Sequence, residues 1–356
     1  MKRVLLIGAG HAHLVVLREL AHSPLYGARV TLVTPHARQI YSGMLPGLIA
    51  GHYRLDEVQV DLAQLCARAY VEFKPGCVAA LDPGRRRARL EDGSELPYDL
   101  VALNAGSLTD TSLAGAAHAI AVKPFEAFIE GLKKATLARV AVAGAGAAGT
   151  ELAMALGYRG AAVTLYADKQ TMSPALAKRA ARALRGSAVD FRPGMAVTAI
   201  EPGPVIIAGS SRQEFDAVVL ATGAVSLPWL RGCGLAVDDE GFVLVHDTLQ
   251  SVSHREVFAT GDCAALADAA DPKSGVYAVR HGAVLAANLR SAIDARALDT
   301  YEPQKRALLL LSCGRRYAIA ERGGWSAEGR WVWRWKDWID RRWIRSLRIP
   351  QDAADS

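Results

Sequence analysis

Short apolar runs alternate with amphipathic stretches along this 356-residue chain, a pattern typical of strands alternating with helices. The first apolar run, Val4–Ile7, precedes an amphipathic stretch near 12–22 and a second run at Ala28–Val33. Because a strand, a helix and a strand in this order form a βαβ unit, we expect a parallel sheet.

The same plan returns in the middle of the chain. A strand is predicted at Val140–Ala143, a helix at 149–158 and a further strand at Ala162–Tyr166. Residues 76–98 and 195–214 differ from both units, because their short strands and turns predict an antiparallel flap in each.

Each unit begins with a glycine-rich turn after its first strand, at Gly8–His13 and Gly144–Gly149. A glycine leaves room for the backbone to approach a pyrophosphate, and the N-terminus of the following helix attracts its charge. Each unit also has an aromatic–Asp–apolar–Gly strand, at Tyr98–Gly106 and Phe215–Gly223. Two such turns in one chain predict two dinucleotide sites and electron transfer between the two cofactors.

The fold class predicted from these patterns is α/β, with two Rossmann-like dinucleotide-binding domains, one inserted in the other, and a C-terminal tail. The first domain is expected to comprise residues 1–110 and 226–300, and the inserted domain residues 111–225. A tail of residues 301–356 closes the chain.

The first unit departs from the usual dinucleotide pattern. His13 replaces the third glycine, so it is either a packing substitution or a side chain beside the cofactor. The second strand ends in Thr34 and Pro35 where a carboxylate usually binds a ribose. Thr34 can bind a ribose hydroxyl instead, and Arg38 can approach a phosphate or the adenine.

The second unit follows the pattern more fully. Asp168, just beyond its second strand, favours the free 2′-hydroxyl of NADH, whereas Lys169 leaves NADPH open. Glu151 lies in the first turn of the unit's helix. It is either a carboxylate that stabilises the helix dipole or a group near the contact between nicotinamide and flavin.

A third strand runs through Val257–Ala259 to Thr260-Gly261-Asp262, and a helix is predicted from about Ser274 to Ile293. A helix N-terminus near a flavin can stabilise negative charge on the reduced ring. Tyr277 and His281 of this helix are therefore candidate catalytic residues, although a lone histidine is also common in cores.

The chain's net charge of +6 changes the view of its partners. Residues 330–348 hold seven basic against two acidic residues, so the excess is local. This distribution argues for a local anionic partner and against nucleic-acid binding. The chain has no 18-residue apolar run and no secretory signal, which predicts a cytoplasmic protein. The five cysteines have neither metal-ligand nor disulfide spacing, so we expect no metal and reduced thiols.

Five of the seven tryptophans lie in the segment Trp331–Trp343. On a helix, one face would hold Trp331, Trp335, Trp338, Ile339 and Trp343, and another Arg334, Asp337, Arg341 and Arg345. Such a helix either lies on an anionic membrane surface as a peripheral anchor or caps the protein or a homodimer partner.

These features resemble the FAD-dependent pyridine nucleotide-disulfide oxidoreductase superfamily, whose fold is glutathione-reductase-like. Within it the chain is similar to type II NADH dehydrogenases, and most similar to the flavoprotein domain found fused to selenide, water dikinase. The stretches that carry the resemblance are Gly8–His13, Tyr41–Gly47, Leu103–Ser107, Val122–Pro124, Thr260–Asp262, Gly275–Arg280 and Trp335–Arg342.

The resemblance implies FAD in the outer domain and NAD(P)H in the inserted one. The residues expected to contact FAD are Gly8, Gly10, His11, Ala12, His13, Thr34, Pro35, Arg38, Met44, Leu45, Pro46, Val78, Asn104, Ala105, Gly106, Gly261, Asp262 and Ala278. Those expected to contact NAD(P)H are Gly144, Gly146, Ala147, Gly149, Asp168, Thr222 and Gly223. The resemblance adds Lys123 to Glu151, Tyr277 and His281 as a candidate catalytic residue.

Three functions fit these expectations. The first is an FAD-dependent NAD(P)H dehydrogenase that passes hydride to FAD and electrons on to a quinone-like acceptor. The superfamily's redox cysteine pair is missing from Tyr41–Pro46, which disfavours disulfide reduction. The second is a flavoprotein that oxidises sulfide or selenide with Cys313 or Cys263 as nucleophile. The third is a non-catalytic flavin module that binds a partner in selenium metabolism or at the membrane.

Overall fold

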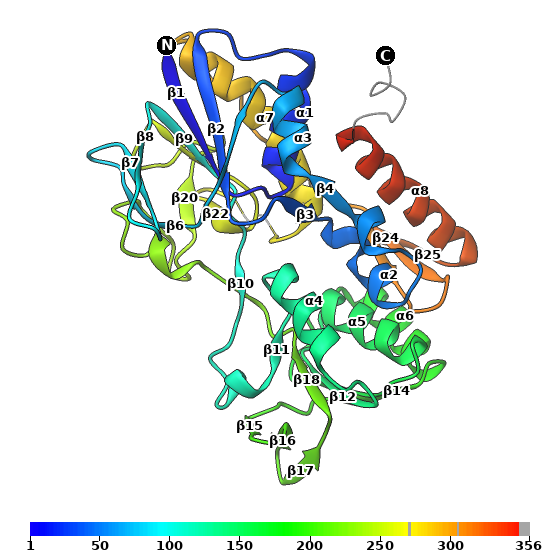
Figure 1. Ribbon diagram of the computed structural model, residues 1–356. Helices are drawn as coiled ribbons and strands as arrows, with labels where there is room; N and C mark the ends of the chain where they lie inside the picture. Colours follow the sequence, from blue (N-terminus) through cyan, green and yellow to red (C-terminus); the bar gives the residue numbers. More distant parts are fainter. Residues whose placement is uncertain (270–271, 305, 349–356) are drawn as a thin grey trace.

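The computed structural model of the protein describes residues 1–269, 272–304 and 306–348. Its elements form two units, which occupy the upper and lower halves of Figure 1. Each unit is built on a five-stranded sheet, so the mixed α/β fold with two Rossmann-type units is confirmed. Residues 305 and 349–356 of the predicted tail lie outside the described residues.

The upper sheet is parallel throughout, in the strand order β21, β9, β1, β2, β5. These strands are Val257–Ala259, Leu100–Leu103, Lys2–Ile7, Ala28–Thr34 and Glu72–Pro75. Helices α1 (His11–His22) and α7 (Gly275–Ile293) pack against each other, and α3 (Leu62–Arg68) packs against α1. A Cβ atom at Gly282 would lie 2.4 Å from the Cβ atom of Val15, so glycine lets α7 approach α1.

The lower sheet is also parallel, in the order β11, β18, β12, β13, β14. These strands are Ile120–Ala121, Ala217–Leu220, Arg139–Ala143, Ala162–Ala167 and Val189–Pro193. The unit's helices are α4 (Phe125–Lys134), α5 (Ala147–Tyr158) and α6 (Pro174–Arg185). Consecutive residues of β12 and β18 are buried, as expected for strands covered on both faces.

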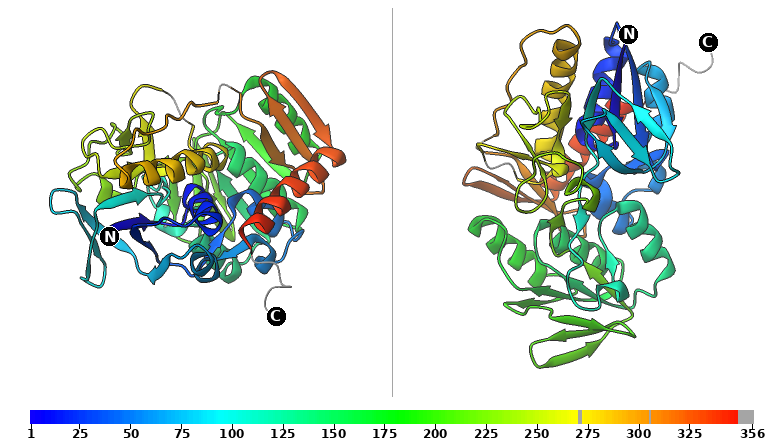
Figure 2. Two further views of the ribbon diagram at one scale, coloured as in Figure 1. Left: turned by 90° about the horizontal axis from the view of Figure 1, so that it is seen from above. Right: turned by 90° about the vertical axis from the view of Figure 1, so that its left-hand side faces the viewer.

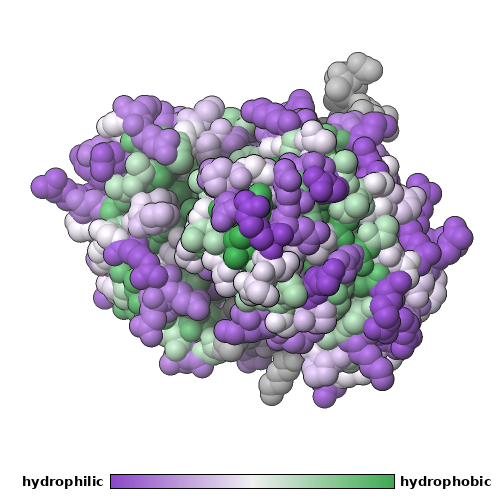
Figure 3. Space-filling view, turned by 90° about the horizontal axis from the view of Figure 1, so that it is seen from below, coloured by the Kyte–Doolittle hydropathy of each residue, from purple (hydrophilic) through white to green (hydrophobic). Residues whose placement is uncertain are grey.

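Both predicted flaps are present as three-stranded antiparallel sheets. They are β6 (Val78–Asp82), β7 (Arg87–Leu90) and β8 (Glu95–Pro97), and β15 (Ala199–Glu201), β16 (Val205–Ala208) and β17 (Ser211–Glu214). Two short pairs are β3 (Arg38–Ile40) with β4 (Gln59–Asp61), and β20 (Val243–Val245) with β22 (Ala264–Leu266). Seen from below, hydrophilic side chains are scattered over the surface and hydrophobic positions show between them (Figure 3).

The chain crosses between the units at β10 (Leu108–Thr109) and β19 (Ala224–Val225), which pair antiparallel. This crossing supports the domain division into 1–110 with 226–300 and 111–225, which we retain as a proposal. After α7 the chain forms the sheet β23 (Leu309–Ser312), β24 (Ala318–Arg322), β25 (Trp325–Gly329) and then helix α8 (Arg330–Leu347).

Helix α8 lies beside β24, β25 and α1 (Figures 1 and 2). The face predicted to hold the tryptophans is not the face that packs on the protein. Trp331 and Trp338 are more than half exposed, whereas Val332, Lys336, Asp340, Ile344 and Leu347 are buried. The sequence analysis did not predict this buried face because Lys336 and Asp340, a charged pair, lie on it. No helix of the described residues is long and apolar enough to cross a membrane.

Candidate functional site

The first glycine turn is shaped by the end of β9. Gly8 has a φ of +85°, and a Cβ atom there would lie 2.5 Å from the Cα atom of Ala105. A Cβ atom at Gly10 would lie 2.4 Å from Oδ1 of Asn104. No side chain caps the N-terminus of α1, which fits a pyrophosphate bound by backbone N–H groups near His11 and Ala12.

Asn104 joins three segments of this turn. Its backbone carbonyl accepts from Gly10 N at 3.1 Å, and its Oδ1 accepts from His13 N at 3.1 Å. Its Nδ2 donates to the Thr260 carbonyl at 2.8 Å. Asn104 therefore holds the start of α1 against the turn at Gly261.

His13 lies under the turn. Its ring is fully buried, and Nδ1 lies 2.6 Å from the Gly8 carbonyl, so Nδ1–H is the donor. Burial lowers the pKa of His13 to about 4, against a smaller opposing effect of that hydrogen bond. The imidazole is thus neutral at pH 7, and this geometry favours the packing interpretation of the missing glycine.

A charged cluster lies beside the turn that follows β21. The Lys123 ammonium is 2.6 Å from Oδ2 of Asp262 and donates to Ser107 Oγ at 2.8 Å. Burial raises the pKa of the Asp262 carboxyl, but Lys123 and the hydrogen bonds outweigh burial, so the pKa lies below its usual value. Because Lys123 comes from the segment leading into α4, the cluster links the two units.

His11 belongs to the same cluster. Burial lowers the pKa of His11, while the Asp262 carboxylate opposes that effect and the Lys123 ammonium adds to it. Nε2 of His11 lies 3.4 Å from Ser42 Oγ, and its ring makes an edge contact with Tyr41.

The segment expected beside the isoalloxazine follows Tyr41 directly. Met44, Leu45 and Pro46 are buried, and Leu45 and Pro46 begin the short helix α2 (Leu45–Ile49). The segment thus presents packed, apolar side chains near the charged cluster, which suits the face of a large aromatic ring.

The adenine end of the first site is more open. Thr34 is buried at the end of β2, whereas Pro35 and Arg38 are exposed. Val78 is buried at the start of β6, and a Cβ atom at the neighbouring Gly76 would touch Leu90. These positions are compatible with the expected adenosine contacts.

The remaining first-site residues line the turns themselves. Gly106 has a φ of +76° with open space where a Cβ atom would lie. At Gly261, also left-handed, a Cβ atom would lie 2.6 Å from Nδ2 of Asn104 and 3.3 Å from the Cβ atom of Ala278. A glycine is therefore required where Asp262 is turned toward Lys123.

The second glycine turn repeats this geometry in the lower unit. A Cβ atom at Gly144 would lie 2.3 Å from the Ala221 carbonyl oxygen, and one at Gly149 would lie 1.8 Å from the Gly144 carbonyl oxygen. Gly146 and Ala147 begin α5, whose N-terminus no side chain caps. A Cβ atom at Gly146 would approach only Thr171, at 3.2 Å, so this side of the turn is open for a phosphate.

A cavity of about 260 Å³ lies next to this turn. Asp168, Lys169 and Gln170 line it, together with Ala145 and Thr150 of the turn and its helix. Asp168 follows β13 and is exposed. The cavity thus has the position and the acid expected for the adenosine end of NAD(P)H.

Thr222 and Gly223 form the other edge of this turn. Thr222 Oγ1 donates to the Asp110 carbonyl at 2.6 Å, and Gly223 adopts a φ of +133° with nothing near a Cβ atom. Both positions are exposed, so the expected contact with the nucleotide is unobstructed.

Glu151 is half-buried where α5 packs against β23. Its Oε1 accepts from Ser312 N at 2.6 Å. Burial raises the pKa of Glu151 to about 7, against the opposing effects of Lys336 and Ser312. A carboxyl with this pKa can hold or release a proton near neutral pH.

The sequence analysis missed the pair Lys336 and Asp340 on α8. Their side chains are 9% and 6% exposed, and Nζ of Lys336 lies 2.6 Å from Oδ2 of Asp340. Lys336 also donates to the Gly43 carbonyl at 2.6 Å, and Tyr41 Oη donates to Oδ1 of Asp340 at 3.1 Å. The i, i+4 spacing is visible in the sequence, but only the packing of α8 buries the pair.

Tyr277 and His281 lie away from this group. Both are buried in α7, and Nδ1 of His281 accepts from Gly261 N at 3.0 Å. The Tyr277 hydroxyl lies 3.5 Å from the Gln304 carbonyl. These contacts give His281 a supporting role at the Gly261 turn, and catalytic roles for both stay predictions.

The cysteines are unpaired and separate from one another in the described residues. Burial raises the pKa of Cys313 to about 12 and also raises the pKa of Cys263. Neither thiol is therefore primed as a thiolate nucleophile. No group of three metal-ligating side chains occurs in the part of the chain that the structure describes.

A protein-family model described as pyridine nucleotide-disulphide oxidoreductase matches residues 2–284. Ferroptosis suppressor protein 1 of Taeniopygia guttata is 28% identical over 283 residues, covering 71% of this chain and 72% of that protein. The nitric oxide reductase FlRd-NAD(+) reductase of Aeromonas hydrophila is 35% identical over 208 residues. That match covers 54% of this chain and 52% of the relative.

Solved structures share the fold. The sulfide:quinone oxidoreductase of Aquifex aeolicus superposes with a TM-score of 0.81 at 16% identity, covering 99% of this chain and 94% of that one. The water-forming NADH oxidase of Lactobacillus brevis, bound to NADH, gives 0.73 at 22% identity, covering 91% and 75%. With the two glycine turns and the family match, the chain belongs to the pyridine nucleotide-disulphide oxidoreductase family and is an FAD- and NAD(P)H-dependent oxidoreductase.

Proposed function

We propose that this chain passes electrons from NAD(P)H through FAD to a quinone-like acceptor. When bound, FAD supplies a ring that takes a hydride from a nicotinamide and passes electrons on. The observation that carries the proposal is the position of Lys336. It donates to Gly43 beside Met44, and its positive charge lowers the pKa of Glu151 on the second glycine-turn helix against the effect of burial. Helix α2, which follows this loop, also packs against α5, so the loop expected at the flavin lies beside the helix expected at the nicotinamide.

The chain's own residues then divide the work. Asn104 and the Lys123–Asp262 pair hold the flavin turn, and Gly144–Gly149 with Asp168 hold the nucleotide. Glu151 can hold or release a proton near neutral pH, and reduction of a quinone-like acceptor consumes protons.

The test is anaerobic titration of the purified flavoprotein with NADH and with NADPH, followed by visible absorbance. We expect the flavin band to bleach and to return when a soluble quinone analogue such as menadione is added. A band that neither nucleotide bleaches would contradict the proposal. The extent of bleaching by each nucleotide also decides which one Asp168 and Lys169 select.

An electron-carrier protein is a second candidate acceptor. It is supported by the similarity to a FlRd-NAD(+) reductase and by the net charge of +6, which would attract an acidic carrier. Reoxidation of the bleached flavin by a small acidic rubredoxin, but not by menadione, would select this acceptor.

The alternative of a sulfide- or selenide-oxidising thiol is disfavoured by the raised pKa values of Cys313 and Cys263. If the Cys313→Ser and Cys263→Ser variants both turn over at the rate of the unmodified protein, this alternative is excluded. The resemblance to the domain fused to selenide, water dikinase, and with it a partner in selenium metabolism, stays a prediction. Binding to purified selenide, water dikinase would test it.

We also propose that this protein is cytoplasmic and meets an anionic membrane surface through α8. The support is its solvent face, where Trp331 and Trp338 lie among the exposed Arg334, Arg342 and Arg345. Replacing both tryptophans by alanine should reduce binding to phosphatidylglycerol vesicles, whereas Trp325→Ala, an exposed tryptophan on β25, should not. If vesicle binding were unchanged, a capping or homodimer role would replace this proposal.

A further inference from the structure

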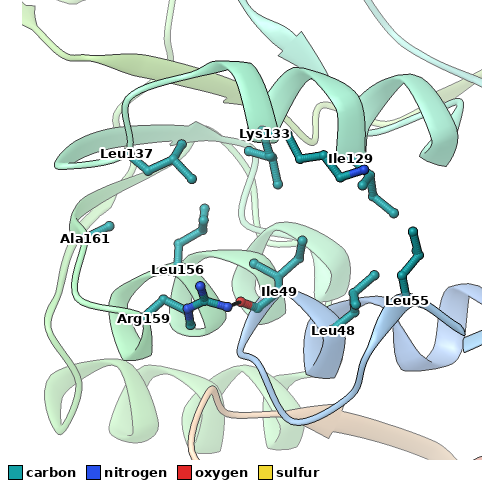
Figure 4. A pocket seen from close by; sticks show the side chains of 10 residues that line it. Leu48, Ile49, Leu55, Ile129, Lys133, Leu137, Leu156, Arg159 and Ala161 are labelled. Atoms are coloured by element: carbon teal, nitrogen blue, oxygen red, sulfur yellow. Dashed lines mark hydrogen bonds between the residues drawn. The ribbon is translucent and has the colours of Figure 1, made fainter. Parts of the chain in front are cut away.

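A cavity of about 440 Å³ lies where helix α2 of the upper unit meets α4 and α5 of the lower unit. Figure 4 shows its lining side chains arranged around an open centre. Eight of the ten lining residues are aliphatic, and the other two are Lys133 and Arg159. A volume in this range suits a small-molecule ligand, for which pockets of roughly 300–1,000 Å³ are typical.

The walls of the cavity are well fixed and its mouth is open. Ile129, Leu132 and Leu156 are buried in the core of the lower unit, whereas Leu48 and Ile49 of α2 are half-buried. Covering half-buried apolar side chains with an apolar ligand removes their surface from water and so favours binding. The lining thus favours a hydrocarbon chain.

The charge at the mouth is positive. Arg159 is exposed, makes a long 3.5 Å hydrogen bond to the Ile49 carbonyl, and pairs with no carboxylate of the described residues. Among the residues that the structure describes, Lys133 pairs only with Glu130, at 2.7 Å and with both side chains more than half exposed. Such exposed pairs are weak, so both cations remain able to bind an anion.

We propose that this cavity binds a long-chain fatty carboxylate, with its chain between α2, α4 and α5 and its carboxylate at Arg159 and Lys133. Guanidinium and carboxylate match in geometry and charge. A neutral quinone tail would make no use of the two cations. A nucleotide is disfavoured because the walls are aliphatic and the Asp168 cavity lies elsewhere in the lower unit.

The site differs from the proposed redox site and needs no electron transfer. It bridges the units, since Leu48 and Ile49 follow Met44 by one turn of α2, and Leu156 and Arg159 follow Glu151 on α5. A bound carboxylate would therefore hold α2 against α5 and stabilise the folded protein by mass action.

The experiment is calorimetric titration of the flavin-loaded protein with dodecanoate and with dodecanol, below the concentrations at which they form micelles. We expect one dodecanoate site per chain and at least tenfold weaker binding of dodecanol. Arg159→Gln should weaken dodecanoate binding about tenfold, as loss of one charge-assisted hydrogen bond predicts. Arg185→Gln, an exposed arginine on α6 outside the cavity, is the matched control and should leave affinity unchanged.

Filling the cavity provides the second test. Leu132→Trp, or Leu137→Trp at the half-buried rim, should abolish dodecanoate binding while the flavin spectrum and melting temperature report whether the variant folds. Equal binding of dodecanoate and dodecanol, unchanged affinity in a folded tryptophan variant, or no binding at all would each overturn the proposal.

Discussion

At the scale of single residues, the turn expected to bind FAD depends on buried polar side chains whose hydrogen-bond partners lie in other elements. Asn104 contacts three segments, and His13 is held neutral beneath the turn by burial. The sequence predicted Asn104 as a cofactor residue only through resemblance. Its hydrogen bonds to His13 and Thr260 join positions 91 and 156 residues away, which no local pattern can reveal.

Replacing Asn104 by alanine removes a buried amide and leaves the His13 N–H and the Thr260 carbonyl without partners. We expect a loss of about 2–4 kcal/mol in the free energy of unfolding and a lower content of bound FAD after purification. Asn288→Ala is the matched control, because Asn288 is an equally buried amide between α7 and the Thr248 carbonyl. It should cost similar stability but retain FAD. If both variants lost FAD equally, the loss would follow from lower stability and not from a specific role of Asn104 at the FAD site.

Glu151 gives a pH dependence with a defined sign. Because its folded-state pKa is raised from 4.5 to about 7, ionising the buried carboxyl destabilises the folded state. Stability should therefore fall as the pH rises from about 4.5 through 7, by up to about 3 kcal/mol. Glu151→Gln should remove this slope in urea unfolding measured at several pH values, whereas the exposed Glu130→Gln should keep it. A slope that persists in Glu151→Gln would refute the assignment.

At the scale of elements, α8 shows that an amphipathic pattern does not by itself identify the packed face. The sequence left open whether the tryptophan face packs on the protein or meets a membrane, and the most buried positions include Lys336 and Asp340. These two satisfy each other as well as Gly43 and Tyr41, so charged residues can occupy a buried face. Two tryptophans remain in solvent, where Arg342 stacks on Trp338.

Breaking the pair on α8 should be costly. Lys336→Met leaves the Asp340 carboxylate buried without its cation, and we expect the free energy of unfolding to fall by about 3–5 kcal/mol. The double variant Lys336→Met/Asp340→Leu should recover most of that loss, since it leaves no buried charge. Denaturant unfolding of both variants measures this difference. Equal destabilisation of the single and double variants would show that the pair acts through packing alone.

At the scale of the whole molecule, the two units meet through a shared apolar cluster, to which the upper unit contributes Ile40 and Leu45, and through charged pairs. Lys123 reaches from the lower unit's first segment to Asp262 of the upper unit, and α8 joins the upper unit to the sheet β23–β25 (Figure 1). The cavity at α2 spans the same joint. We therefore expect the relative position of the nucleotide and flavin sites to depend on this joint.

Lys123→Met tests the joint directly. Without the ammonium, the pKa of Asp262 should rise. The two units should then hold the nicotinamide ring less precisely against the flavin ring. We expect flavin reduction by NADH, followed by stopped-flow absorbance, to slow by about tenfold or more, as misplacement of reacting groups predicts. FAD content should be retained, and the exposed Lys133→Met should reduce at the normal rate. If the rate of flavin reduction by NADH were unchanged in Lys123→Met, the Lys123–Asp262 pair would not control how the two units are aligned.

The sequence by itself determined the repeated βαβ units, both flaps, the glycine turns and the long C-terminal helix. Those features follow from local periodicity and from glycine's lack of a Cβ atom, which act over a few residues. Only the tertiary structure decided the buried face of α8, the contact of Lys336 with Gly43, and the cavity between α2 and α5. Each of these joins residues far apart in the chain, and burial and charge pairing at such contacts depend on which elements pack together.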